Sequence, residues 1–269
     1  MASGEMTSAE LATFLERAFR NLANHSVDGS IAFICMDWRH MGEMLEAGNK
    51  VYSELKNLIV WAKDNGGMGT FYRSRHELVF AFKNGTAPHI NSFELGQHGR
   101  YRTNVWQYRG VNTLKAGRMD ELALHPTVKP VAMIADAIKD VSSRNGVVLD
   151  LFGGSGSTLI AAHKTGRRAF LCELDPVYCD RIILRWQLYV KDDAILQNSG
   201  QNFDEVGRQR SMEQDPSIRT IANQSKTDEG QEVKSTLPGS EWSAELEPEI
   251  AQRVRADFAT HSVADRLSR

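Results

Sequence analysis

Two carboxylates and a run of glycines have the residue types and spacing to bind a small ligand. The stretch VLDLFGGSGSTLIAAHKTG, residues 148–166, has the pattern of an apolar strand that ends at Asp150, a glycine-rich turn and a helix. Glu173 ends the next apolar strand, 23 residues after Asp150. Because ligands bind at the carboxyl ends of the strands in open α/β sheets, we expect both acids to face one ligand.

The residues that the turn lacks narrow the choice of ligand. A Walker loop needs a lysine just before its Ser or Thr, but the first lysine after Gly156 is Lys164. A dinucleotide fingerprint has a third glycine where this chain has Leu159. Asp150 would repel a pyrophosphate but attract a sulfonium, and Glu173 is placed to accept hydrogen bonds from ribose hydroxyls. S-adenosylmethionine has a ribose, a cationic centre and no phosphate, so it is the ligand that fits; the alternative is a turn that serves only packing.

Strand and helix patterns alternate along the first 190 residues. Apolar runs predict strands at residues 30–38, 55–63, 76–83, 146–152 and 167–175. Helical spacing predicts helices at residues 8–25, 39–51, 130–143, 155–166 and 176–190. Strands that are apolar on both faces indicate an α/β fold with a doubly wound, mostly parallel sheet.

Composition favours a cytoplasmic protein with no membrane partner. The chain has no run of about 18 uncharged apolar residues, and its start lacks the basic and apolar regions of a signal peptide. Its three cysteines, Cys35, Cys172 and Cys179, have no Cys-x-x-Cys spacing. We therefore expect reduced thiols rather than a disulfide framework or a metal site.

Positive charge is concentrated in the middle of the chain. Between Lys63 and Lys129 there are ten Lys or Arg residues and five acids, although the whole chain has a net charge of −2. Residues 84–127 are polar and mix basic with aromatic side chains, which favours nucleic-acid binding. Their aromatic side chains would pack either against an unstacked base or against the domain: Tyr101, Trp106 and Tyr108.

The C-terminal residues have a different composition. Residues 201–269 contain thirteen acids and nine bases and no sustained apolar period, so we expect a polar, acidic tail that is partly disordered or helical. Within it, residues 240–259 have the pattern of an amphipathic helix. The expected organisation is one domain over residues 1–200, with a recognition insert at 84–127, followed by the tail.

Several segments together resemble one known family. DLFGGSGSTLIAA followed by ELDPVYCDRII resembles the cofactor motifs of the DNA methyltransferases that modify adenine N6 or cytosine N4. HPTVKP, residues 125–130, is similar to the segment that closes over S-adenosylmethionine in the circularly permuted, beta-type branch of that family. NLIVWAKDNGG and SRHELVFAFKNG resemble the segments after its catalytic strand, so the resemblance covers about residues 7–206.

The resemblance implies a Rossmann-like, S-adenosylmethionine-dependent methyltransferase domain and assigns roles by position. The cofactor loop would comprise Asp150, Phe152, Gly153, Gly154, Ser155 and Gly156, with Glu173 on the ribose. The closing segment would contribute His125, Pro126, Thr127, Lys129 and Pro130. Lys129 could meet the methionine carboxylate or could be a solvated lysine at a helix entry. The basic residues expected to face DNA phosphates are Arg73, Arg75, Arg100, Arg102, Lys115 and Arg118.

The chain departs from the family at the catalytic loop. Family members use an Asp-Pro-Pro-Tyr type segment, whose acid and backbone carbonyl accept the amino hydrogens of a flipped base. The chain has no such motif, and we assign no catalytic residue. LDPVY, residues 174–178, follows Glu173 directly and is expected to be the ribose-side turn and helix start. The sheet is therefore expected to lack a central strand.

We expect methyl transfer from S-adenosylmethionine to an exocyclic amino group of double-stranded DNA, in the setting of restriction-modification. The missing strand would be explained by a start at an internal methionine of a longer enzyme, by degeneration, or by supply from another polypeptide, and we favour the first. A homodimer is left open. The alternative functions are an inactive or truncated DNA-binding remnant and a methyltransferase for RNA or a small molecule.

Overall fold

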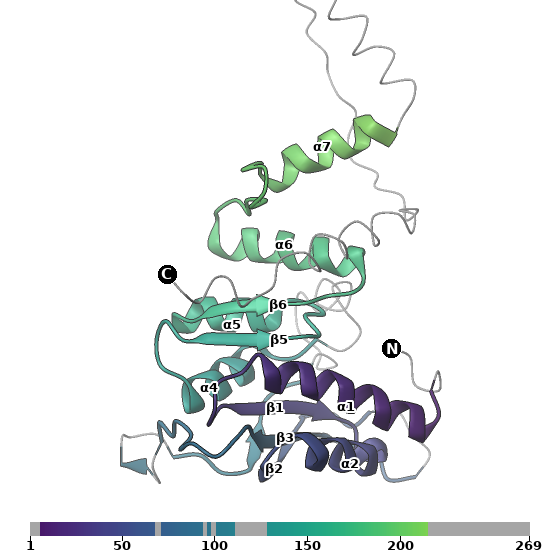
Figure 1. Cartoon of the computed structure of the whole chain (residues 1–269), viewed down its shortest axis with the longest axis vertical. Helices are drawn as coiled ribbons and strands as arrows, with labels where there is room; N and C mark the ends of the chain where they lie inside the picture. The colour runs from purple at the N-terminus through teal and green to yellow at the C-terminus, as the bar shows by residue number, and fades with distance from the viewer. Residues whose placement is uncertain (1–5, 68–70, 94–95, 98–100, 111–127, 215–269) are drawn as a thin grey trace, which may run out of the picture. The chain divides into compact units, whose positions relative to one another are not determined.

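The computed structural model describes residues 6–67, 71–93, 96–97, 101–110 and 128–214 (Figure 1). Its helices are α1 (Ser8–Asn24), the 3-10 turn η1 (Trp38–His40), α2 (Met41–Val51), α4 (Val131–Val141), α5 (Ser157–Thr165), α6 (Pro176–Val190) and α7 (Phe203–Gln214). Its strands are β1 (Ile31–Met36), β2 (Glu54–Ala62), β3 (His76–Lys83), β4 (Val105–Gln107), β5 (Val147–Asp150) and β6 (Arg168–Leu171). Each helix and strand expected before residue 190 is present, and β4 is an addition within the polar region.

The larger sheet has the strand order β1-β3-β2-β4. β3 is antiparallel to both β1 and β2, whereas β2 and β4 are parallel. β1, β2 and β4 therefore run in one direction and β3 alone opposes them. The helix α2 connects β1 to β2, and a helical crossover of this kind joins strands that run in the same direction. The connection from β2 to β3 contains no described helix. A connection without a helix typically joins antiparallel strands. The expected mostly parallel sheet is confirmed, with β3 as its exception.

The centre of the larger sheet is β3, which is buried on both faces. Leu78, Phe80 and Phe82 pack in a cluster with α1 and α2, which includes Phe19 and Met44. Burial of this apolar surface is the main favourable contribution to packing α1 and α2 on the sheet.

The opposite face of the same strand packs against α4. Val79 and Ala81 alternate with the residues above and lie in a second cluster with Trp61, Trp106 and Met133. The period of two along β3 thus places its side chains in two separate cores.

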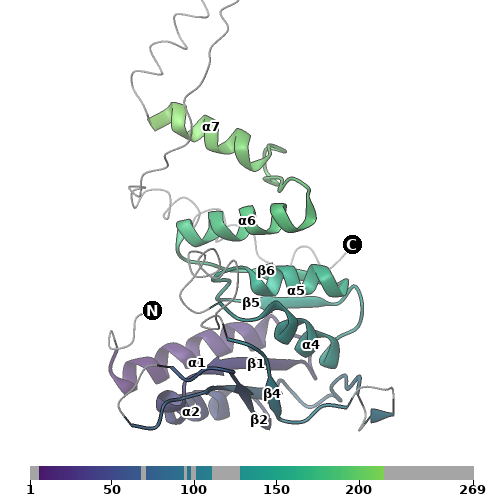
Figure 2. The same cartoon turned by 180° about the vertical axis from the view of Figure 1, so that it is seen from behind.

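The smaller sheet consists of β5 and β6, which pair in parallel from Val147↔Arg168 to Asp150↔Leu171. Its covering helices are α4 and α5, which lie beside each other in the reversed view (Figure 2). Ala135 and Ile138 of α4 pack with α5, while Met133 and Ala137 pack on the larger sheet. One helix therefore packs against both sheets.

Among the edge strands of the two described sheets are β1 and β5. There, β1 pairs only with β3 and β5 pairs only with β6, so the two sheets are not hydrogen-bonded to each other. All six residues of β1 are only partly buried, although helices cover both faces of the sheet. The expectation that the sheet lacks a central strand stays a prediction.

The first helix begins at a capping box. Thr7 Oγ1 accepts from the backbone N of Glu10 at 3.3 Å, and Glu10 Oε2 accepts from the backbone N of Thr7 at 2.8 Å. These two bonds satisfy amide groups that have no partner inside the helix.

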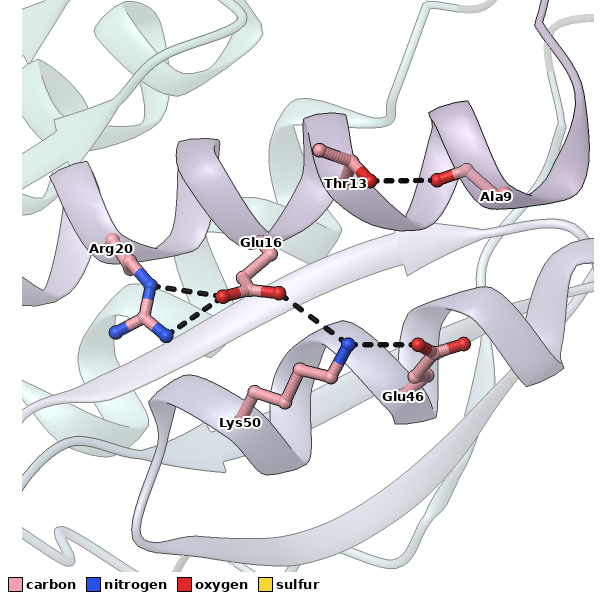
Figure 3. A network of polar contacts seen from close by, with 6 residues as sticks. All are labelled: Ala9, Thr13, Glu16, Arg20, Glu46 and Lys50. Carbon is pink, nitrogen blue, oxygen red and sulfur yellow. Dashed lines mark hydrogen bonds and ion pairs between the residues drawn. The ribbon is translucent and has the colours of Figure 1, made fainter.

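Polar contacts on the outer faces of α1 and α2 join the two helices (Figure 3). Glu16 lies 2.7 Å from Arg20 of the same helix and 3.5 Å from Lys50 of α2, which also contacts Glu46 at 2.8 Å. Arg20, Glu46 and Lys50 are exposed to solvent and Glu16 is half-buried, so the contacts add little to stability compared with the apolar core.

The chain divides into two compact units at Ile182, within α6. In the second unit, Ile195 and Asn202 form an isolated antiparallel bridge, and α7 follows. Asn202 and Glu205 cap this helix reciprocally, at 2.8 and 2.9 Å. α7 lies at the start of the predicted tail, and the helix predicted at 240–259 lies outside the described residues, so the organisation of the tail stays a prediction. None of the described helices is long and apolar enough to cross a bilayer.

Candidate cofactor site

The two acids predicted from sequence meet at the glycine turn. Asp150 Oδ1 accepts from the backbone N of Phe152 at 2.9 Å, and its Oδ2 accepts from Thr158 Oγ1 at 2.7 Å. Glu173 Oε2 accepts from the backbone N of Gly154 at 2.7 Å. The turn is therefore held from both strand ends.

Glu173 also organises its own turn. Its Oε1 accepts from the backbone N of Leu174 at 2.8 Å and of Asp175 at 3.1 Å. A carboxylate offers roughly four acceptor positions. The three hydrogen bonds just described leave Oε2 with capacity for a further donor such as a ribose hydroxyl.

The glycines of the turn have a packing role as well. Gly156 has a φ of 76° at the N-cap of α5, and a Cβ there would lie 3.1 Å from Ile182 Cγ2. A Cβ at Gly153 would lie 3.0 Å from Ile182 Cδ1. Close packing of the turn on α6 therefore explains these two glycines whether or not a ligand binds.

Other predicted loop residues differ in exposure. Phe152 is 54% exposed, and its ring centroid lies 6.1 Å from that of Phe14 in α1. Ser155 is buried and its hydroxyl lies 3.2 Å from that of Ser157. The exposed Phe152 ring offers an apolar surface at the carboxyl end of β5, and Ser155 belongs to the interior of the turn.

Lys129 belongs to an ion cluster at the end of the larger sheet where β2 ends and β3 begins. Its Nζ lies 2.9 Å from Glu77 Oε1, and Lys63 Nζ lies 3.0 Å from Glu77 Oε2. Burial lowers the pKa of Lys129, but Glu77, Cys35 and Asp150 together outweigh this effect, so the pKa of Lys129 is raised overall. Pro130 is the N-cap of α4 rather than a residue of its first turn.

Cys35, near the end of β1, has a thiol whose pKa is raised. Burial raises the pKa of Cys35 to about 11, with smaller effects of Lys129, which lowers it, and of Glu77, which raises it. A thiol that stays protonated at neutral pH is a poor nucleophile. The raised pKa of Cys35 therefore gives no support to a role for this thiol as a nucleophile.

The LDPVY segment begins a helix, as expected. Asp175 Oδ1 accepts from the backbone N of Val177 at 2.8 Å, and α6 starts at Pro176. Proline is favoured at such a position because its missing N–H would have no helical partner.

The arginines predicted to face DNA make internal contacts. Arg73 donates to the carbonyls of Gly66 and Gly67 at 2.9 and 2.8 Å, and Arg75 Nε donates to the carbonyl of Lys63 at 3.1 Å. Both side chains remain on the exposed surface. They hold the loop after β2, so DNA contact by either stays a prediction.

Arg102 differs from the sequence expectation, because its side chain points into the protein. Its Nε lies 3.1 Å from Asp140 Oδ2, and its Nη1 donates to Tyr108 Oη at 2.9 Å. The guanidinium also lies over the ring of Trp106, which is buried. Trp106 and Tyr108 therefore pack against the domain, one of the two alternatives left open, whereas Tyr101 is 76% exposed.

Several predicted site residues lie outside the described residues: Arg100, Lys115, Arg118, His125, Pro126 and Thr127.

Two exposed aromatic residues were missed in the sequence. Phe71 and Tyr72 are 83% and 87% exposed, with ring centroids 4.2 Å apart. Trp38 donates from Nε1 to Ser74 Oγ at 3.1 Å, which joins the end of β1 to the same loop. The signal was readable: FYRSR places aromatic residues beside arginines in a loop that contains glycines.

Comparison with known proteins identifies the family. The family model N6_N4_Mtase, described as DNA methylase, matches residues 2–185. The chain belongs to this DNA methylase family. The type II methyltransferase M.ScaI of Streptomyces caespitosus is 38% identical over 82 residues, which cover 30% of this chain and 27% of that protein. The chain spans from 20% to 53% of the length of the curated relatives it matches.

Solved structures of DNA methyltransferases share the fold. The cytosine-N4-specific PvuII DNA methyltransferase aligns with a TM-score of 0.56 and 14% identity, over 69% of this chain and 74% of that one. The complex of M1.HpyAVI with S-adenosylmethionine aligns with a TM-score of 0.50 and 18% identity, over 64% and 81%. These similarities confirm the Rossmann-like α/β fold expected from the sequence.

Proposed function

We propose that this domain transfers a methyl group from S-adenosylmethionine to an exocyclic amino group of adenine or cytosine in double-stranded DNA, in the cytoplasm. Membership of the DNA methylase family supports the reaction class. The observation in the fold that supports it most is the turn held by Asp150 and Glu173, because it places two carboxylates at one ligand-binding edge.

The side chains present fit the cofactor. Glu173 has acceptor capacity for a ribose hydroxyl, and Lys129 carries a positive charge suited to the methionine carboxylate. Phe152 offers an exposed apolar ring beside the turn. When bound, S-adenosylmethionine supplies an electrophilic methyl group on a sulfonium. In the transfer, a bond forms from the amino nitrogen to the methyl carbon, the carbon–sulfur bond breaks and the nitrogen loses one proton.

The acceptor of that proton is proposed to come from a strand between β1 and β5. α1 and β1 follow each other in the chain and run in opposite directions (Figure 1), so the start of α1 lies toward the carboxyl end of β1. The contact of Phe14 with Phe152 places α1 beside the carboxyl end of β5 as well. A strand that precedes α1 in the polypeptide could therefore pair with both β1 and β5 and end at the cofactor edge.

Its source is proposed to be a segment upstream of Met1 rather than a second copy of the chain. The test of this source is to express a longer protein whose reading frame extends upstream of Met1. Recovery of methyl transfer to DNA by the longer protein, with a monomer in size-exclusion chromatography, supports the proposal. Transfer by a dimer of the present chain would contradict it.

The DNA-facing surface is proposed to include Phe71, Tyr72, Arg73 and Arg75. Exposed aromatic rings can stack on an unpaired base, and nearby arginines can contact phosphates. The predicted contributions of Arg100, Lys115 and Arg118 belong to the same proposal.

The decisive measurement is titration calorimetry with S-adenosylmethionine. We expect binding to the wild-type protein and a loss of at least about tenfold in affinity for Asp150→Ala and Glu173→Ala, since each change removes a charged acceptor. Unchanged affinity in both variants would reject the site. DNA binding without cofactor binding or methyl transfer would instead favour an inactive, DNA-binding remnant.

A further inference from the structure

The ion cluster of Lys63, Glu77 and Lys129 has a defined structural origin. Lys63 follows β2 directly, and Glu77 is the second residue of β3, paired in register with Trp61 of β2. The paired strands therefore fix both the carboxylate and the first ammonium. Lys129 comes from a different part of the chain, just before α4, and reaches the same carboxylate.

All three charged groups are largely withdrawn from solvent. Their side chains are 28%, 17% and 26% exposed for Lys63, Glu77 and Lys129. Lys63 Nζ also lies 4.4 Å from the centre of the Trp61 ring, and Trp61 Nε1 donates to the carbonyl of Tyr108 at 2.8 Å. The partner that orients Glu77 is thus itself held by a buried aromatic side chain.

The charges keep Glu77 ionised. Burial raises the pKa of Glu77, but Lys129 and Lys63 together outweigh that effect, so the pKa of Glu77 lies below its ordinary value. Asp150 adds to the effects that raise the pKa of Lys129. Lys129 therefore lies in the field of both Glu77 and the acid of the glycine turn.

One ammonium group can serve two carboxylates. The Lys129 ammonium has three N–H donors, and its contact with Glu77 occupies one of them. We propose that Glu77 is a positioning residue, whose carboxylate holds Lys129 so that a remaining N–H meets the carboxylate of the cofactor's methionine portion. This inference rests on the proposed function, because it requires S-adenosylmethionine at this edge.

Two ligands separate this role from a general effect on folding. S-adenosylhomocysteine carries the amino-acid carboxylate, whereas 5′-methylthioadenosine has the same adenosine and a thioether but no carboxylate. In Glu77→Gln we expect affinity for S-adenosylhomocysteine to fall about tenfold, because a charge-assisted hydrogen bond loses its geometry. Affinity for 5′-methylthioadenosine should change less than about twofold.

Glu54→Gln is a matched control. Glu54 lies at the other end of β2 and pairs with Lys56 at 3.1 Å, so the substitution removes the same charge from a contact outside the site. Both ligands should bind this variant as they bind the wild type. The double variant Glu77→Gln/Lys129→Met should lose no more S-adenosylhomocysteine affinity than Lys129→Met alone, since Glu77 acts through Lys129.

Glu77→Asp keeps the test valid if Glu77→Gln does not fold. It retains the charge but withdraws the carboxylate by one methylene, so a loss confined to S-adenosylhomocysteine is again expected. Equal losses for both ligands, or no loss for either, would overturn the positioning role. Failure of the wild-type protein to bind either ligand would instead reject the proposed function and this inference with it.

Discussion

The Lys129 ammonium lies 2.9 Å from the Glu77 carboxylate, which connects the segment before α4 to the end of the β2–β3 pair. The spacing of the two residues along the chain does not predict this contact. The charge of Asp150, the acid of the glycine turn, also acts on Lys129 and contributes to raising the pKa of Lys129.

The ion cluster should make stability depend on pH in the acid range. The folded-state pKa of Glu77 is lowered, so its contribution is fully present above its unfolded pKa of about 4.3 and is lost as the pH falls through the lower folded value. We expect the difference in unfolding free energy between wild type and Glu77→Gln to stay constant from about pH 7 to 5 and to shrink below about pH 4.3. Urea denaturation at several pH values in this range measures the difference in unfolding free energy. A difference that grows on acidification would contradict the stabilising role of the ionised Glu77.

Removing the hydroxyl that holds Asp150 should weaken the turn. Thr158 Oγ1 donates to Asp150 Oδ2 at 2.7 Å, so Thr158→Val leaves a half-buried carboxylate oxygen short of one donor. We expect a loss of about 1–3 kcal/mol in unfolding free energy, together with weaker cofactor binding. Thr13→Val is the control, because Thr13 Oγ1 donates only to the carbonyl of Ala9 on the exposed side of α1 (Figure 3). Equal effects of the two changes would argue against a special role for Thr158.

Gly156→Ala should destabilise the domain. The residue has a φ of 76°, and the added Cβ would press on Ile182. We expect a loss of about 1–3 kcal/mol. Gly42→Ala is a matched control on α2, because no atom lies within 4 Å of the Cβ it would add. That change should stabilise by about 0.5–1 kcal/mol, as chemical denaturation can show; a tolerated alanine at 156 would refute the packing argument.

The exposed aromatic pair should contribute to DNA binding. We expect Phe71→Ala and Tyr72→Ala each to weaken binding of an oligonucleotide by about 1–3 kcal/mol if the ring stacks on a base. Cofactor affinity should be unchanged. Val27→Ala, at another exposed apolar residue, should have no effect on DNA affinity. Fluorescence anisotropy at two salt concentrations measures these affinities, and loss of cofactor binding in either aromatic variant would indicate a misfolded loop instead.

Some features of the site were predictable because they depend on local pattern. The strand, acid, glycine turn and helix at residues 147–165 follow from hydrophobic period and backbone freedom, and Asp150 and Glu173 could be placed at strand ends from order alone. The capping box at Thr7 and the helix start at Pro176 are likewise local hydrogen-bonding patterns. The two acids, with no Walker lysine and no third glycine, indicated the ligand, and the family motifs agreed with it.

Long-range contacts decided the rest. The sequence shows that Arg102 and Lys129 are basic but does not indicate which acids they pair with. Only the fold brings Asp140 to Arg102 and Glu77 to Lys129. The antiparallel insertion of β3 between β1 and β2 is also a tertiary result, since the apolar pattern of a strand is the same in either direction. Chain pattern thus determined which elements form and where the ligand-binding edge lies. Packing decided which charged side chains form ion pairs inside the protein and which can still contact a ligand. The reason is that a buried charge without a partner has a high desolvation free energy.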